Sequence, residues 1–199
     1  MTIPARALTA LVAAAVAASA ADYRIEPAEG SRFTLSVEKT GLYKGKKHLL
    51  VYERYSGLLR YDPATPAASQ VRFAVEAASA ALRDDWGSGP NHKKILAYAF
   101  GNMMDAERHP RITFTSSRVE PGGEQQFRVT GTLEIRGIAK PCEVAVHLDT
   151  LDDGALVLEG RAAIRMTDYG LKPPTAALGA IGTKDLMEVS FKLRAAKPQ

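Results

Sequence analysis

The sequence is poor in cysteine, since Cys142 is the only one among its 199 residues. A single cysteine cannot form an intramolecular disulfide, and it excludes a metal cluster built on several thiolates. A reactive thiol would need an exposed and electropositive setting. We therefore interpret Cys142 as a small residue that follows a turn.

The sequence also lacks the motifs of common catalytic and metal-binding sites. The histidines form no HExxH arrangement and have no paired acid at ligand spacing: His48, His92, His109 and His147. No serine sits in a G-x-S-x-G elbow, and there is no phosphate loop or dinucleotide fingerprint. The acidic pair Asp84–Asp85 lies in a turn-like stretch, where turn chemistry explains it. We predict no catalytic residue, no metal site and no cofactor, so the protein is not expected to be an enzyme.

Charge of one sign and long hydrophobic runs are both scarce. With 46% hydrophobic and 24% charged residues and a net charge of +4, the composition is that of an ordinary globular protein. Lysine and arginine are scattered apart from Lys44, Lys46 and Lys47, so nucleic-acid binding is not predicted.

The N-terminal residues are a separate case. The apolar run from Leu8 to Ala18 is too short to span a bilayer, and Ala18-Ser19-Ala20 fits a small-x-small cleavage pattern. We therefore predict a signal peptide over residues 1–20, a single domain over residues 21–199 that does not span a membrane, and a periplasmic or secreted location.

What the sequence has in abundance is alternation with a period of two. Phe127, Val129, Leu133 and Ile135 share one parity while polar residues hold the other, which predicts a strand with one apolar face. Gly131 interrupts the apolar parity and indicates a bend or bulge. Residues 137–141 then form a turn, and Pro141 is expected at the first position of the next strand.

Similar alternation predicts strands along most of the remaining chain. The expected strands cover residues 22–25, 33–37, 48–61 with a kink at Gly57, 71–75, 112–114, 144–148, 156–166 and 187–193. One helix is expected, with Asn91 as its N-cap and apolar residues at helical spacing up to Glu107. Roughly eight to ten antiparallel strands plus one helix allow either a barrel or a sandwich, and periodicity alone does not decide between them.

Four segments resemble motifs of one known family. Gly131–Pro141 (GTLEIRGIAKP) is similar to the hairpin "G-x-L-T-I-R-G-V-x-K-P" of the YceI-like family. His109–Ser116 resembles its "hP-x-I-x-F-x-S" strand entry, and Ile164–Gly170 its "R-x-D-F-G" segment. Tyr55–Pro63 resembles its "F-x-G-x-L-x-Y-D-P" strand and turn. The matches occur in order over nearly all of the chain that follows the predicted signal peptide.

The resemblance implies an all-β fold with one helix, an antiparallel lipocalin-like β-barrel of about eight strands that holds a ligand in its pore. It also implies a periplasmic protein whose partner is a long-chain isoprenoid or another amphiphilic lipid. The oligomeric state is left open, with a homodimer as one alternative. We expect the inward parity of the strands and the helix region, as a lid, to contact the ligand: Phe33, Leu35, Val37, Lys39, Phe73, Tyr98, Phe100, Met103, Met104, Phe114, Phe127, Val129, Leu133, Ile135 and Phe191.

One departure from the family pattern bears on the ligand's head group. Lys39 stands where the family motif "F-x-V-x-H-x-G" has a histidine. Because a lysine is charged at neutral pH, we expect an anionic or polar head group near Lys39 and the loop that holds Lys44, Lys46 and Lys47. The alternative is that Lys39 points into solvent.

Two other functions remain open from the sequence. One is a secreted lipid or ester hydrolase that uses a hydroxyl group inside the barrel. The other is a β-sandwich interaction module without a small-molecule site.

Overall fold

The computed structural model describes residues 20–86 and 89–198. The predicted signal peptide therefore lies, apart from Ala20, outside the described residues. The helix and strands have these bounds: β1 (Ala21–Ile25), β2 (Arg32–Gly41), β3 (Lys47–Tyr52), β4 (Tyr55–Tyr61), β5 (Gln70–Glu76), β6 (Ala80–Leu82), α1 (Gly89–Tyr98), β7 (Arg111–Gly123), β8 (Gln126–Ile135), β9 (Ile138–Thr150), β10 (Leu156–Arg165), β11 (Thr175–Ala176) and β12 (Ile181–Ala196).

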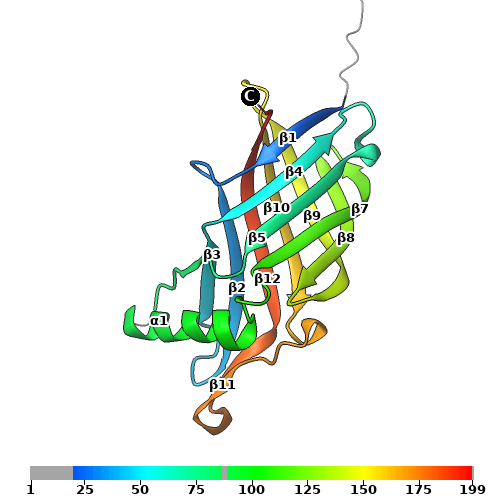
Figure 1. The fold of residues 1–199 in the computed structure, drawn as a ribbon. Helices are drawn as coiled ribbons and strands as arrows, with labels where there is room; N and C mark the ends of the chain where they lie inside the picture. Colours follow the sequence, from blue (N-terminus) through cyan, green and yellow to red (C-terminus); the bar gives the residue numbers. More distant parts are fainter. Residues whose placement is uncertain (1–19, 87–88, 199) are drawn as a thin grey trace, which may run out of the picture.

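The antiparallel strands close into a barrel of eight positions (Figure 1). The ring runs β1, β4, β5, β7, β8, β9, β10 and β12, and it closes where Arg24 of β1 pairs with Ala196 of β12. The remaining strands β2, β3 and β6 extend the pairing from β12. The predicted barrel with one helix is thus confirmed, and the sandwich alternative is wrong.

Three neighbouring barrel positions are each made of two short strands in line. In the first position, β1 and β2 pair successive parts of β12. In the second, β4 pairs β1 and β3 pairs β2. In the third, β5 pairs β4 and β6 pairs β3. At the shared break, Ser79 accepts a hydrogen bond through its backbone oxygen from the Glu53 amide, and its hydroxyl donates to the Glu76 carbonyl. The side chain of Ser79 therefore stabilises the break.

This break corrects the interpretation of residues 48–61 as one strand kinked at Gly57. The interruption falls at residues 53–54, between β3 and β4, whereas Gly57 lies within β4. Gly57 has another role: a Cβ atom there would lie 2.9 Å from the ring of Phe73, so only glycine lets that ring pack against the β4 backbone. The short strand β6 had no counterpart among the predicted strands.

The hairpin between β8 and β9 is tighter than expected. Arg136 and Gly137 both have positive φ, 53° and 74°, which is the geometry of a two-residue type I′ turn. Pro141 is therefore inside β9, opposite Thr132, and not at its start. The proline is tolerated because β10 pairs β9 only from Ala145 onward, so its missing N–H faces no partner strand.

The bend predicted at Gly131 is a bulge on the neighbouring strand. The register between β7 and β8 shifts between Ser116 and Arg118, opposite Gly131. A Cβ atom at residue 131 would lie 2.6 Å from the ring of Phe114, so glycine is needed for the close packing. The bulge changes the inward parity of β7 from even to odd numbers.

The helical segment is shorter than predicted, and it begins earlier. α1 starts at Gly89, so Asn91 is not its N-cap. After Tyr98 the chain makes a π-helical turn, Ala99–Met103, and Asp105 has φ of 47°, which ends the helix well before Glu107. Figure 1 shows α1 beside the barrel end that carries β11, away from the end with β1 and the C-terminus.

Candidate ligand-binding cavity

The inward faces of the barrel strands and one face of the helical segment enclose a cavity of about 560 Å³. That volume is in the range of sites that bury a small organic ligand. Its wall is overwhelmingly apolar, and burial raises the pKa of the wall residue Tyr52 to about 12, so this phenol carries no charge near neutral pH. Such a space suits a hydrocarbon chain and offers little to a polar solute.

All of the residues predicted to contact a ligand line this cavity. They come from five strands and the helical segment: Phe33, Leu35, Val37 and Lys39 on β2; Phe73 on β5; Tyr98, Phe100, Met103 and Met104; Phe114 on β7; Phe127, Val129, Leu133 and Ile135 on β8; and Phe191 on β12. Once the resemblance had indicated a barrel, alternation with a period of two was enough to place the strand residues on its inner face. That these residues contact a ligand stays a prediction.

Sequence reasoning left out a large part of the wall. The inward residues of β9 and β10 were not proposed, although Val144, Val146 and Leu148 had been recognised as alternating. Cys142 shares their parity and lines the cavity, as do Ala162 and Ile164 of β10. Extending the parity rule from β8 to every strand would have found them.

Aromatic rings meet around Phe33 on one side of the cavity. The ring centroid of Phe33 lies 5.3 Å from Phe73, 6.1 Å from Phe191 and 6.0 Å from Tyr52, with edge-on or offset geometries. Ring pairs in this range are favourable beyond the area they bury. The cluster gives this part of the cavity a rigid wall.

The helical segment supplies the most adaptable part of the wall. Ile95 and Phe100 pack against the buried core cluster that includes Leu50 and Tyr52, and Met103 and Met104 pack against a second cluster that includes Ile135 and Met166. Methionine side chains fill irregular space and adjust to different occupants. The π-helical turn, a local feature often found at functional sites, lies where Phe100 and Met103 line the cavity.

The cavity reaches the molecular surface mainly at the helical end. Of its five exposed lining residues, four lie there: Lys94 and Tyr98 on α1, and Thr175 and Ala176 on β11; the other is Gln70. We call this end the mouth.

Among the residues that the structure describes, Lys39 is the one buried lysine or arginine in the cavity wall. It is 9% exposed, so it does not point into solvent. Burial lowers the pKa of its amino group, and the nearby carboxylate of Asp84 offsets this only in part. Among the described residues its amino group has no hydrogen-bond or salt-bridge partner, and this leaves it available to a ligand. The loop lysines Lys44, Lys46 and Lys47, expected near the head group, do not line the cavity.

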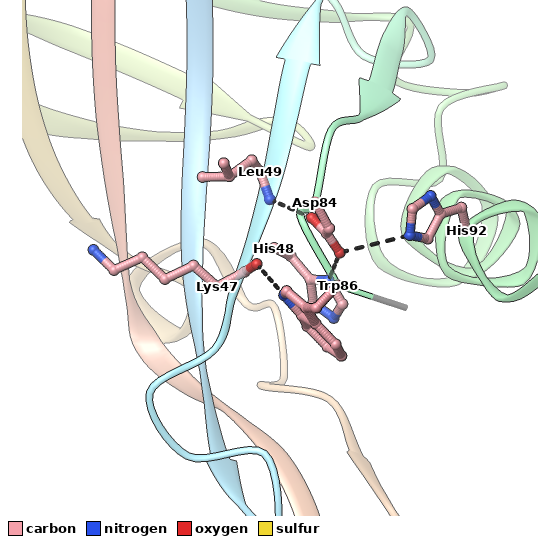
Figure 2. A network of polar contacts seen from close by, with 6 residues as sticks. All are labelled: Lys47, His48, Leu49, Asp84, Trp86 and His92. Atoms are coloured by element: carbon pink, nitrogen blue, oxygen red, sulfur yellow. Dashed lines mark hydrogen bonds and ion pairs between the residues drawn. The ribbon is translucent and has the colours of Figure 1, made fainter. Parts of the chain in front are cut away.

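Close to Lys39, a buried carboxylate ties the segment before α1 to the barrel (Figure 2). The side chain of Asp84 is 1% exposed, and its two oxygens engage His48 Nδ1 at 2.6 Å and the Leu49 amide at 2.8 Å. His92 of α1 points Nε2 toward the same carboxylate at 4.0 Å, beyond hydrogen-bond distance. We call His48 and Asp84 the anchor pair.

Trp86 completes the attachment. Its indole N–H donates to the Lys47 carbonyl at 2.8 Å, and its ring stacks on His48 at 5.0 Å and on Tyr43 at 5.5 Å. The acid pair at residues 84–85 was interpreted as turn chemistry. For Asp84 that interpretation is wrong, because its partners come from β3, far away in the sequence.

The described residues contain no group of three or more histidine, cysteine or acidic side chains that could hold a metal ion. Within residues 20–86 and 89–198, no helix has the length and apolar character needed to cross a membrane.

The reactivity of the Cys142 thiol can be used to detect a ligand in the cavity. It lines the cavity at 8% exposure, and burial, with a smaller contribution from Glu143, raises its pKa. Because the thiolate is the reactive form, we expect an aromatic disulfide reagent to react more slowly than with a free cysteine near neutral pH. The rate should keep rising at alkaline pH, where an ordinary thiol has levelled off, and a long-chain ligand should slow it further.

The measurement is the absorbance of the released aromatic thiol, with the urea-unfolded protein as the control. A rate equal to that of the unfolded protein, unaffected by any long-chain compound, would contradict the placement of Cys142 inside the cavity.

Comparison with known proteins gives one consistent answer. The sequence profile of the YceI-like domain matches residues 23–195. A UPF0312 protein of Azotobacter vinelandii is 28% identical over 177 residues, covering 86% of this chain and 87% of that protein. A UPF0312 protein of Shewanella baltica is 28% identical over 175 residues, covering 83% and 86%.

Two solved structures share the fold at low sequence identity. BcnA of Burkholderia cenocepacia superposes with a TM-score of 0.62 at 21% identity, covering 81% of this chain and 95% of that one. A polyisoprenoid binding domain from Saccharophagus degradans superposes with a TM-score of 0.62 at 13% identity, covering 88% and 98%.

Proposed function

Because the chain belongs to the YceI-like family and its barrel surrounds an apolar cavity, we propose that it binds the tail of a long-chain isoprenoid or another amphiphilic lipid. The observation that carries the proposal is the cavity of about 560 Å³ with its nearly uninterrupted apolar wall. The solved polyisoprenoid binding domain of the same fold supports the choice of ligand class.

The energetics favour a hydrocarbon tail. Each methylene group moved from water into such a cavity gains about 0.8 kcal/mol, so about ten give roughly 8 kcal/mol before the cost of association is subtracted. The adaptable methionines of the helical segment suit a flexible chain. A tail can therefore be held without a hydrogen bond. Selectivity between ligands then depends on the contacts that the head group makes near the mouth.

We propose binding rather than catalysis. Among the described residues no serine or threonine hydroxyl is hydrogen-bonded to a histidine, and His48 is already engaged by Asp84. The hydrolase alternative thus has no observation in its favour.

Native mass spectrometry of the purified protein is the direct test. We expect part of the protein to carry a copurified amphiphile of defined mass, which organic extraction releases for identification. Protein that emerges only at its bare mass, and that binds no added long-chain isoprenoid or fatty alcohol, would refute the proposal. Turnover of ester substrates without stable binding would favour the hydrolase.

Lys39 is proposed to select the ligand's head group. We expect Lys39→Met to weaken binding of a carboxylate- or phosphate-headed amphiphile by about tenfold or more, because the buried amino group would otherwise pair with the anion. Binding of the neutral alcohol with the same tail should be unchanged. Lys44→Met is the matched control, since Lys44 is exposed and does not line the cavity.

The pH dependence follows from the lowered pKa of Lys39. The anion prefers the protonated amine, so its affinity should fall as pH rises through a pKa that lies below that of an ordinary lysine. The affinity of the neutral alcohol should not change over this range. Calorimetric titration of both compounds across alkaline pH measures the difference, and parallel pH profiles would contradict the role of Lys39.

We further propose that the domain of residues 21–199 acts in the periplasm or as a secreted protein after removal of residues 1–20. The support is the sequence pattern of the first twenty residues. N-terminal sequencing of the protein from its native host should begin near Ala21. An uncleaved cytoplasmic product would contradict export.

A further inference from the structure

The two most exposed large apolar side chains of the described residues lie together at the mouth end of the barrel. Leu178 is fully exposed, and Leu42 is 79% exposed. Leu42 is in the turn between β2 and β3, and its amide donates to the Ala180 carbonyl at 3.0 Å, which ties this turn to the loop that carries Leu178. With Tyr43, 44% exposed, they form what we call the apolar tip.

The backbone of the loop presents Leu178 outward at a conformational cost. Ala177 and Leu178 have φ of 50° and 55°, and Gly179 follows with 91°. Left-handed geometry is uncommon for any residue with a side chain, and for a bulky one it is an outlier. Folding alone would favour glycine or asparagine at residue 178, so an exposed leucine there calls for a partner outside the barrel.

The two loops that form the apolar tip carry charge of one sign. Residues 41–47 and 170–184 contain five lysines and no acidic residue. Lys47 and Lys184 are paired with Glu188 and Glu38. Lys44, Lys46 and Lys172 are exposed and form no salt bridge with any described residue. Unpaired lysines that flank exposed leucines are the composition of surfaces that bind anionic lipid interfaces.

The apolar tip borders the mouth of the cavity. Thr175 and Ala176 line the cavity, and Leu178 is two residues further along the same loop. Figure 1 shows the β2–β3 turn and the β11 loop at the same end of the barrel. A surface that contacts the apolar tip would therefore face the opening.

We propose that the apolar tip docks on the surface of an anionic lipid bilayer. Leu178 and Leu42 insert among the acyl chains, the lysines Lys44, Lys46 and Lys172 face the lipid phosphates, and the mouth opens toward the membrane. This is a second interaction, separate from ligand binding in the cavity, although it would bring the mouth to a source of amphiphiles.

A protein partner fits the same surface less well. Three apolar side chains cannot supply the roughly 800 Å² per partner of a stable protein interface. Two copies meeting through this surface would also bring their lysines together, and like charges are disfavoured. A bilayer needs neither a large complementary area nor a fixed shape.

The test is cosedimentation of the purified protein with vesicles. We expect binding to vesicles of phosphatidylcholine mixed with phosphatidylglycerol, little binding to phosphatidylcholine alone, and release by salt as the charges are screened. Leu178→Asp should lower the partition coefficient by about tenfold or more. Leu58→Asp is the matched control, because Leu58 is 59% exposed on β4 and pairs with Arg24 of β1. Figure 1 shows β1 at the end of the barrel away from β11.

Charge is tested separately from apolar insertion. The double variant Lys44→Glu, Lys46→Glu should lose the preference for anionic vesicles, since each basic residue near such a surface contributes roughly fivefold. The variant Ala162→Phe, which occupies part of the cavity, should bind vesicles as the wild type does. A failure of ligand binding and a failure of docking are therefore measured independently.

Three results would overturn the proposal: no binding to anionic vesicles at low salt, equal loss with Leu178→Asp and Leu58→Asp, or a dimer in solution that Leu178→Asp dissociates while vesicle binding is absent. The last would assign the apolar tip to a second copy of the chain.

Discussion

Ala162→Phe is expected to abolish most of the affinity for a long-chain ligand while leaving the barrel folded. Ala162 lines the cavity from β10, opposite Val189 of β12. A phenyl ring there occupies space that a tail would fill. If it displaces about three methylene groups at about 0.8 kcal/mol each, affinity falls roughly fiftyfold. Added volume at residue 162 extends into the cavity and not into packed side chains, so overpacking strain should be small.

The neighbouring residue provides a matched control. Ala163 has the opposite parity and is exposed on the outer face of β10, so Ala163→Phe adds the same ring outside the barrel. Isothermal titration with a long-chain alcohol measures both variants, and urea denaturation checks their folding. Equal affinities for the two variants would show that the tail does not occupy the cavity.

Asp84→Ala is expected to cost about 3 kcal/mol of unfolding free energy. The variant leaves His48 and the Leu49 amide without the buried carboxylate that both contact, and breaking such a pair is expensive. For a chain of this size the melting temperature should fall by roughly 6–12 °C. Asp84→Asn keeps the shape and some of the hydrogen bonding, so its unfolding free energy should lie between those of Asp84→Ala and the wild type.

Asp85→Ala is the control, because Asp85 is adjacent and exposed and should change stability by less than about 0.5 kcal/mol. Urea unfolding followed by circular dichroism gives the free energies. If both alanine variants are equally stable, the anchor pair does not hold the segment before α1 to the barrel.

Alternation predicted part of the cavity wall, because in a closed barrel every second residue of a strand points inward. Once Phe127, Val129, Leu133 and Ile135 share a face, closure decides that the face is the inside. Lys39 shows the same rule at work on a polar residue: it continues the parity of Phe33, Leu35 and Val37, and the structure buries it in the cavity wall.

The features that escaped prediction depend on contacts between distant residues. Asp84 and Trp86, in the segment before α1, contact His48 of β3, and no spacing in the sequence predicts a contact between residues so far apart. The strand break at residues 53–54 is stabilised by hydrogen bonds to Ser79, which lies in the connection between β5 and β6. The helix ends early through a π-helical turn and a positive φ at Asp105, which propensity does not encode.

The closure of the ring between β1 and β12 has a consequence for how the barrel assembles. The pairs Arg24–Ala196 and Ile25–Ala195 join strands from opposite ends of the described chain. Pairing strands that are so distant in the sequence carries a loop-closure entropy cost, and contacts of high sequence separation form slowly. Until β12 pairs with β1, the barrel is open and the apolar residues of the cavity wall are exposed to water. A chain that arrives unfolded in a compartment would need protection from aggregation until β12 is in place.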